Sequence, residues 1–162
     1  LVRIPAEHLR ILVRPCGRAK SKADYIKNFA TLLEQHYHSN IEELLAEETS
    51  SLRKRLLTVK GIGEFTCDNI LLYAAQRTKL PINDRVRKVF FEHDLIDELD
   101  TYDTAQRRIE RSLPFDAPRL QELDAMLYHT TRDYCGPVPR CDACPLSGLL
   151  SERGPRSRRG ET

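Results

Sequence analysis

The sequence lacks any apolar run long enough to cross a membrane, and it lacks the alternation of polar and apolar residues that marks β-strands. No stretch of about 18 apolar residues occurs, so we expect no transmembrane helix. The opening residues, LVRIPAEHLR, contain no basic segment followed by an apolar one, so we expect no signal peptide there. These absences favour an intracellular protein that does not bind membranes.

The sequence also has little excess charge of either sign. The formal net charge is only +2, which by itself indicates no class of partner. Basic residues nevertheless gather locally, and such clusters either follow a phosphate backbone or form solvated helix faces, which is the more common case. The clusters are Arg53-Lys54-Arg55, Arg85 with Arg87-Lys88, Arg107-Arg108 with Arg111, and the arginines at 153, 156, 158 and 159.

The five cysteines are an odd number, and three of them crowd between residues 135 and 144. In a chain with no recognisable export signal, this crowding favours metal or cluster binding over disulfide bonds.

Apolar residues recur at helical spacing along most of the chain, which predicts an all-α fold. Ser50 and Ser51 are available to cap one helix, and Asp84 is placed to cap another. We expect helices within residues 5–14, 21–37, 41–47, 50–59, 64–76, 84–95, 101–113 and 118–135.

The stretch Lys60-Gly61-Ile62-Gly63 joins two expected helices and predicts a helix-hairpin-helix. Glycines permit positive φ and close backbone approach, and Ile62 would pack inward. Gly63 would open the second helix, whose free N–H groups form an anion site. An ordinary helical hairpin would use the same glycine, so the stretch alone leaves both interpretations open.

A loop ending in LPIND, with Asp84 at a helix start, follows the hairpin. The order KGIGEFTCDNILLYA…LPIND resembles the endonuclease III-like superfamily of DNA glycosylases, named for its hairpin and its Gly/Pro-rich loop with an aspartate. The segments RPCGRAKSKADYIKNFATLLEQ and CGPVPRCDACPL extend the resemblance over roughly residues 1–150. Within the superfamily, LLTVKGIGEFTCDNILLYA looks most like the branch that excises alkylated purines such as 3-methyladenine.

The resemblance implies that Asp84 stabilises the positive charge that develops on the sugar and activates a water molecule. Its alternative role is that of a plain helix cap. Bifunctional relatives carry a lysine two residues after the second hairpin glycine, where this chain has Phe65. Phenylalanine cannot form a Schiff base, so the resemblance implies a monofunctional glycosylase. Phe65 either stacks on a flipped base or fills the core.

The resemblance also implies a partner and its contacts. The partner is double-stranded DNA with a damaged base, bound by a monomer in the cytoplasm, at the nucleoid, or in the nucleus. Arg18 lies where some relatives place a residue that wedges into the duplex. The expected hairpin contacts are Lys60, Gly61, Ile62 and Gly63.

The cysteine segment departs from the pattern of the family. Cys135, Cys141 and Cys144 match ligands of a [4Fe–4S] cluster, which normally takes four thiolates. The usual spacing is Cys-x6-Cys-x2-Cys-x5-Cys, but here the first interval is one residue short and Leu150 stands at the fourth position. A labile cluster on three thiolates is one interpretation; we favour a degenerate loop without iron.

The expected organisation is a helical bundle that carries the hairpin and ends in the cysteine loop. Residues 1–83 form the hairpin-bearing part, apparently without the N-terminal helices usual in the family. Residues 84–150 form a second lobe, and residues 151–162 a disordered tail. Two other functions stay open: a bifunctional glycosylase with lyase activity, and a helix-hairpin-helix module that binds DNA without chemistry.

Overall fold

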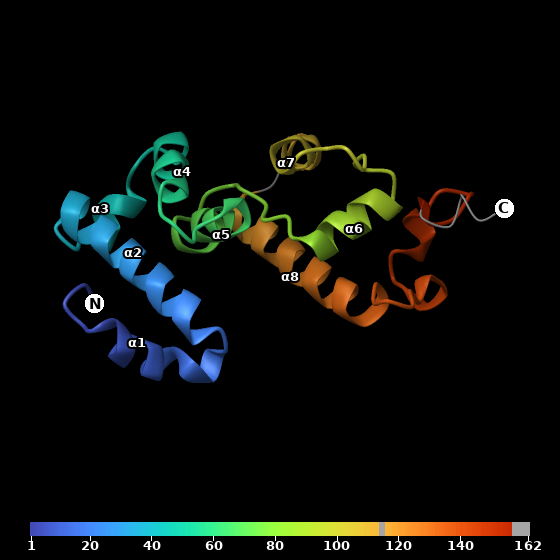
Figure 1. The fold of residues 1–162 in the computed structure, drawn as a ribbon. Helices are drawn as coiled ribbons and strands as arrows, with labels where there is room; N and C mark the ends of the chain where they lie inside the picture. Colours follow the sequence, from blue (N-terminus) through green and yellow to red (C-terminus); the bar gives the residue numbers. More distant parts are fainter. Residues whose placement is uncertain (114–115, 157–162) are drawn as a thin grey trace. The chain divides into compact units, whose positions relative to one another are not determined.

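The computed structural model describes residues 1–113 and 116–156, and every regular element in this part of the chain is helical (Figure 1). The prediction of an all-α fold is therefore confirmed. The chain forms two compact units, Leu1–Ala75 and Gln76–Thr162. No helix among the described residues is both long enough and apolar enough to span a bilayer.

The first unit contains the helix-hairpin-helix. The helices α4 and α5 flank the hairpin, and a short π-helix over Ile70–Ala74 continues α5. The long helix α2 follows α1 and packs against it. The α-helices of this unit are α1 (Ala6–Val13), α2 (Ala19–Tyr37), α3 (Ile41–Leu45), α4 (Thr49–Leu57) and α5 (Glu64–Asn69).

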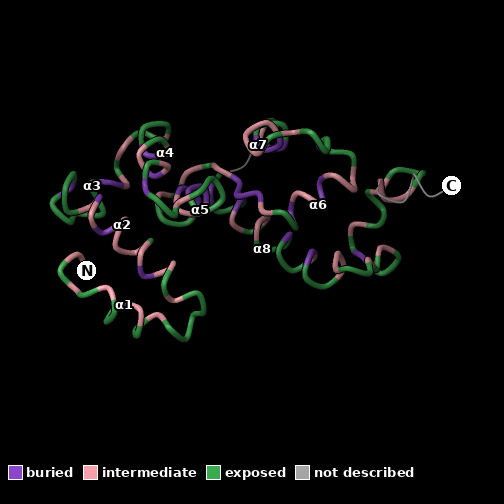
Figure 2. The backbone as a smooth tube through the Cα atoms, in the orientation of Figure 1, coloured by how far each residue is buried: buried purple, intermediate pink, exposed green. Residues whose placement is uncertain are grey.

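The core of the first unit joins the two hairpin helices to α2 and α3. Leu52 and Leu56 of α4, spaced by four residues, lie on one helix face, as do Cys67 and Leu71 in the second hairpin helix. Figure 2 shows these buried stretches in purple. Each fully buried leucine contributes about 1.5–3 kcal/mol. The cluster comprises Leu32, Tyr37, Leu44, Leu52, Leu56, Val59, Cys67 and Leu71.

The second unit contains α6 (Asp84–Glu92), α7 (Tyr102–Glu110) and α8 (Ala117–Tyr134). Helices α6 and α8 pack together, and both contribute buried residues to the core of this unit. Two short 3-10 turns follow α8, over Cys141–Ala143 and Ser147–Leu149. We call residues 135–150, which include both turns, the cysteine loop.

Two helix caps differ from the sequence prediction. Glu48, rather than Ser50 or Ser51, caps α4, because its carboxylate accepts hydrogen bonds from both serine amides. Asn83, rather than Asp84, caps α6, and its Oδ1 accepts from two backbone amides at 2.9–3.0 Å. In both helices the capping side chain stands one to three residues earlier than predicted.

The segment after the cysteine loop is partly described. The guanidinium of Arg156 lies 4.7 Å from the centre of the Phe91 ring. Its two terminal nitrogens donate to the carbonyl of Ile96 and to the carboxylate of Asp97, each at 3.1 Å. The remainder of the predicted disordered tail, residues 157–162, lies outside the described residues. The predicted division at residues 83 and 84 stays a prediction.

Candidate functional site

The two hairpin glycines have different conformations. Gly61 has a φ of 106°, which only glycine adopts readily. A Cβ at this position would lie 2.0 Å from Cδ1 of the Tyr25 ring. Gly63 instead has an extended backbone with a φ of −91°, and nothing lies within 4 Å of the position its Cβ would take. The prediction of a positive φ therefore applies to Gly61 alone.

Gly63 caps the second hairpin helix without a side chain. The first helical bond runs from the amide of Cys67 to the carbonyl of Gly63 at 2.8 Å. The amides of the three residues between them have no carbonyl partner within the helix. Gly63 and these residues are exposed, while Ile62 packs against the apolar core. The hairpin thus exposes backbone N–H donors, while Ile62 anchors the turn to the core.

A buried ion pair joins the hairpin helices. Nε of Arg53 donates to Oδ1 of Asp68 at 3.1 Å, and the Asp68 side chain is fully buried. Beside them, burial and, to a smaller extent, the neighbouring charge of Asp68 raise the pKa of the Cys67 thiol to about 12. A thiol held neutral in this way is unreactive at neutral pH. Cys67 is therefore a core residue.

Arg18 and the hairpin line the same hollow of the first unit. The hollow has a volume of about 560 Å³, and Gly61, Ile62 and Tyr25 also line it. Arg18 is exposed at the N-terminus of α2 and has a positive φ of 49°, which is uncommon for arginine. The structure therefore brings together three of the residues that the sequence predicted to contact DNA, Arg18, Gly61 and Ile62.

Many of the basic residues singled out in the sequence are engaged within the fold. Arg53 pairs with Asp68 as described, and Arg55 pairs with Glu47 at 3.2 Å. Arg87 donates to the backbone carbonyl of Glu98 at 3.1 Å. These three arginines are therefore held by partners within the fold.

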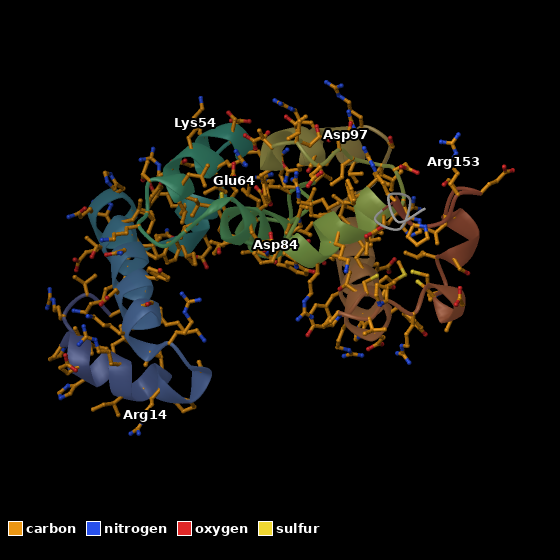
Figure 3. The ribbon with its side chains drawn as sticks, turned by 45° about the vertical axis from the view of Figure 1, so that its right-hand side comes forward. Arg14, Lys54, Glu64, Asp84, Asp97 and Arg153 are labelled. Carbon is orange, nitrogen blue, oxygen red and sulfur yellow. The ribbon has the colours of Figure 1, made fainter. Side chains whose placement is uncertain are left out.

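Asp84 is the first residue of α6, where it is labelled in Figure 3. Because Asn83 provides the cap, the carboxylate of Asp84 is not used for capping. It is exposed, and it makes no hydrogen bond or ion pair with the other described residues. Asp84 lines a hollow of about 220 Å³ in the second unit, together with Lys88 and Phe91. The hairpin belongs to the first unit and Asp84 to the second.

Phe65 lies on the first turn of α5 and keeps 40% of its surface exposed. The interpretation of Phe65 as a core residue is therefore wrong. The backbone carbonyl of Phe65 accepts a hydrogen bond from the side-chain amide of Asn69 at 2.8 Å. This is the only hydrogen bond between Phe65 and a side chain among the described residues. The ring is left available on the surface.

The cysteine loop brings its three thiols to one small cavity. Cys135, Cys141, Cys144 and Leu150 all line a space of about 30 Å³. Burial raises the pKa of Cys135, and the neighbouring thiols of Cys144 and Cys141 raise it further.

These residues do not fit a [4Fe–4S] cluster. Such a cluster takes four thiolates, and the fourth position holds the apolar side chain of Leu150. Among the described residues, no three histidine, cysteine or acidic side chains are arranged to hold a metal ion.

Sequence reasoning missed three residues that shape these features. Asn83 could have been found, because asparagine caps helices as well as aspartate does and it stands one residue earlier. Tyr25 and Asn28 lie on α2, more than 30 residues before the hairpin turn that they contact. No local pattern signals contacts at that separation.

Known proteins share both sequence and fold with this chain. The chain is 30% identical over 148 residues to a protein of Methanocaldococcus jannaschii whose name provisionally assigns it as a DNA repair glycosylase. It is 26% identical over 135 residues to a Sulfolobus acidocaldarius protein named endonuclease III. These matches cover 90% and 83% of the chain, but 67% and 57% of the relatives. No protein-family profile matches.

Two solved structures resemble the fold across 99% of the chain. One is a non-covalent complex of endonuclease III with DNA, with a TM-score of 0.75 and 18% identity over 70% of its length. The other is a trapped covalent intermediate of endonuclease III with DNA, with a TM-score of 0.74 and 19% identity over 68% of its length. With a relative at 30% identity matched over two thirds of its length, the chain belongs to the endonuclease III-like superfamily of DNA glycosylases.

Proposed function

We propose that this chain is a monofunctional DNA glycosylase that removes a damaged base, an alkylated purine, from double-stranded DNA. The observation that carries the proposal is the exposed carboxylate of Asp84, which neither caps its helix nor pairs with a described residue. A carboxylate that accepts no hydrogen bond and forms no ion pair with a described residue, at the position that matches the aspartate of the family, is free to act on a substrate.

The proposed reaction needs a carboxylate and a water molecule. The bond between C1′ and the base nitrogen breaks, and its electron pair leaves with the base. The positive charge that develops on the sugar is stabilised by the carboxylate of Asp84. The oxygen of water then bonds to C1′, and a water proton passes to the carboxylate. The products are the free base and an abasic strand that remains intact.

Phe65 supports hydrolysis by water rather than attack by an amine. Its position matches the lysine of bifunctional relatives, and a phenyl ring can neither attack C1′ nor form a Schiff base. The ring is 40% exposed, which suits stacking on a base taken out of the duplex. The choice of an alkylated purine rests on the likeness of residues 56–74 to that branch of the superfamily.

The hairpin is proposed to bind the DNA backbone. The exposed Gly63 and the unpaired amides that follow it suit a phosphate oxygen, and Lys60 adds a positive charge beside them. Arg18, exposed at the rim of the same hollow, is proposed to enter the gap left by the flipped base. We further propose that the protein acts as a monomer and needs no iron for base release.

The replacement Asp84→Asn tests the chemistry. It preserves the size of the side chain and leaves the Asn83 cap in place, so the fold should be unchanged. Release of bases from alkylated duplex DNA should fall at least about 100-fold, while binding to the duplex holds or tightens. Asp142→Asn, an equal loss of charge at another exposed residue of the second unit, is the control. Unchanged base release in Asp84→Asn would refute the proposed role.

Borohydride trapping on abasic DNA tests the absence of an amine nucleophile. The wild-type chain should form no cross-link, whereas Phe65→Lys should form a small amount. The gain should be small because a lysine in an exposed position stays mostly protonated. Cross-linking by the wild-type chain, through a residue such as Lys60, would instead indicate a bifunctional enzyme.

The identity of the released base completes the test. Alkylated duplex DNA is incubated with the chain, and the released bases are identified by mass spectrometry. Release of methylated purines supports the proposed branch, whereas release of an oxidised pyrimidine would assign another substrate. Duplex binding without release of any base would indicate a binding module.

A further inference from the structure

Helix α2 holds the hairpin turn through two side chains. Nδ2 of Asn28 donates a hydrogen bond to the backbone carbonyl of Lys60 at 2.8 Å. The ring of Tyr25 fills the space where any other residue would place its Cβ at Gly61. Tyr25 and Asn28 are three residues apart, so they lie on the same face of α2. One helix face therefore contacts two consecutive residues of the turn.

These two contacts set the path of the turn. The carbonyl of Lys60 and the amide of Gly61 belong to one planar peptide unit, so a hydrogen bond to the carbonyl also fixes the direction of the amide. Gly61 then has its φ of 106°, and the Tyr25 ring limits how far the chain can move there. The next two residues, Ile62 and Gly63, lead directly to the exposed amides of α5.

A glycine turn without such contacts would be costly to order. Glycine loses more conformational freedom on ordering than any other residue, and this loss opposes binding when it occurs at that moment. A turn that is already held in place avoids that loss. The core alone does not supply the restraint at Lys60 and Gly61, because both residues are exposed and only Ile62 of the turn packs inward.

We propose that Asn28 and Tyr25 are positioning residues that hold the hairpin in the conformation that binds DNA phosphate. This inference rests on the proposed contact between the hairpin and DNA. Tyr25 keeps 39% of its surface exposed, and Asn28 lies outside the buried core cluster. Their replacement should therefore change DNA binding more than it changes the stability of the fold.

Asn28→Leu is the decisive variant, because leucine approximates the shape of asparagine but cannot donate to Lys60. Gln35→Leu is the matched control. Gln35 is exposed on the same helix and lines the same 330 Å³ hollow as Asn28 and Lys60. The side chain of Gln35 makes no hydrogen bond with the other described residues. Asn28→Gln keeps an amide donor and should partly restore the binding lost in Asn28→Leu.

The measurement is the Kd for an undamaged duplex over a series of salt concentrations, at a temperature where circular dichroism shows every variant to be folded. Asn28→Leu should raise the Kd about three- to ten-fold, the effect of one hydrogen bond. Its salt dependence should also weaken. Amide hydrogen exchange at residues 61–65 should accelerate, and Tyr25→Ala should act in the same direction. Gln35→Leu should match the wild type in every measurement.

Two outcomes would overturn the inference, and they are distinguishable. If Gly63→Val weakens binding but Asn28→Leu and Tyr25→Ala do not, the hairpin binds DNA without needing these residues. If Gly63→Val leaves the Kd unchanged at all salt concentrations, the proposed phosphate contact is wrong. The positioning role of Asn28 and Tyr25 is then wrong as well, because it depends on that contact.

Discussion

The buried ion pair of the helix-hairpin-helix offers a test of how the hairpin helices are held together. Arg53 and Asp68 join α4 to α5 at 3.1 Å, and their side chains are 19% and 0% exposed. The perturbation is Arg53→Leu, made alone and together with Asp68→Leu. The single change removes the Arg53 charge from beside a buried carboxylate, whereas the double change leaves two apolar side chains.

The expected magnitudes follow from the burial of the two groups. Breaking a buried pair by removing one partner lowers the free energy of unfolding by about 3–5 kcal/mol. Replacing both partners with apolar residues is neutral or stabilising by about 1–4 kcal/mol. Replacing Arg53 should therefore lower the free energy of unfolding when residue 68 is aspartate, but not when it is leucine. The coupling energy between the two positions should exceed about 3 kcal/mol.

Urea denaturation followed by circular dichroism measures these values in a double-mutant cycle. Arg55→Leu on the same helix is the control, because Arg55 and its partner Glu47 are 39% and 21% exposed. This more exposed pair should contribute about 1 kcal/mol or less. The reasoning would be refuted if Arg53→Leu lost no more unfolding free energy than Arg55→Leu. It would also be refuted if the double variant were as unstable as Arg53→Leu alone.

Three further outcomes are expected. Gly61→Ala should lower the free energy of unfolding by about 1–3 kcal/mol, because its φ is 106° and its Cβ would meet an aromatic ring of α2. A Cβ at Gly63 would meet no other atom, so Gly63→Ala should leave the free energy of unfolding unchanged. Equal shifts in the melting temperature of the two variants would contradict this distinction. Hydrogen bonds from Arg108 and Arg156 hold the pKa of Asp97 below its usual range. The stability from this lowered pKa is present above the usual aspartate pKa and is lost as pH falls. Amide exchange, corrected for its intrinsic rate, should therefore reveal release of the segment after the cysteine loop in acid, and Asp97→Asn should remove this pH dependence. Protein purified from iron-replete cells should contain well under four irons per chain, and a full complement with stable visible absorption would show our reading of the loop to be wrong.

The helices could be predicted because their signal is local. Apolar spacing in α2 and in α6 identifies each helix without knowledge of its neighbours. The exact ends could not be predicted, because several adjacent side chains can cap the same helix. Glu48 precedes the two serines that were expected to cap α4, and the backbone geometry decides among them.

The roles of the hairpin residues were predictable only in part. The pattern Gly61-Ile62-Gly63 indicated a turn with one inward side chain, and both features are present. It could not distinguish the two glycines, because the need for glycine at Gly61 arises from a ring on α2. The pattern also gave no reason to single out Asn28, whose partner lies 32 residues away. Contacts at such separations depend on how the helices pack.

The pair Asn83-Asp84 shows how two adjacent residues of similar chemistry take different tasks. Either side chain could cap α6, and the sequence favoured the aspartate. In the structure the Oδ1 atom of Asn83 accepts both capping hydrogen bonds, so the carboxylate of Asp84 takes no part in the cap. A cap needs only an acceptor atom, which asparagine supplies, whereas stabilising a sugar cation needs a negative charge, which only the aspartate supplies. The neutral residue therefore anchors the helix, and the charged residue is fixed beside that anchor in the position where our proposal needs it.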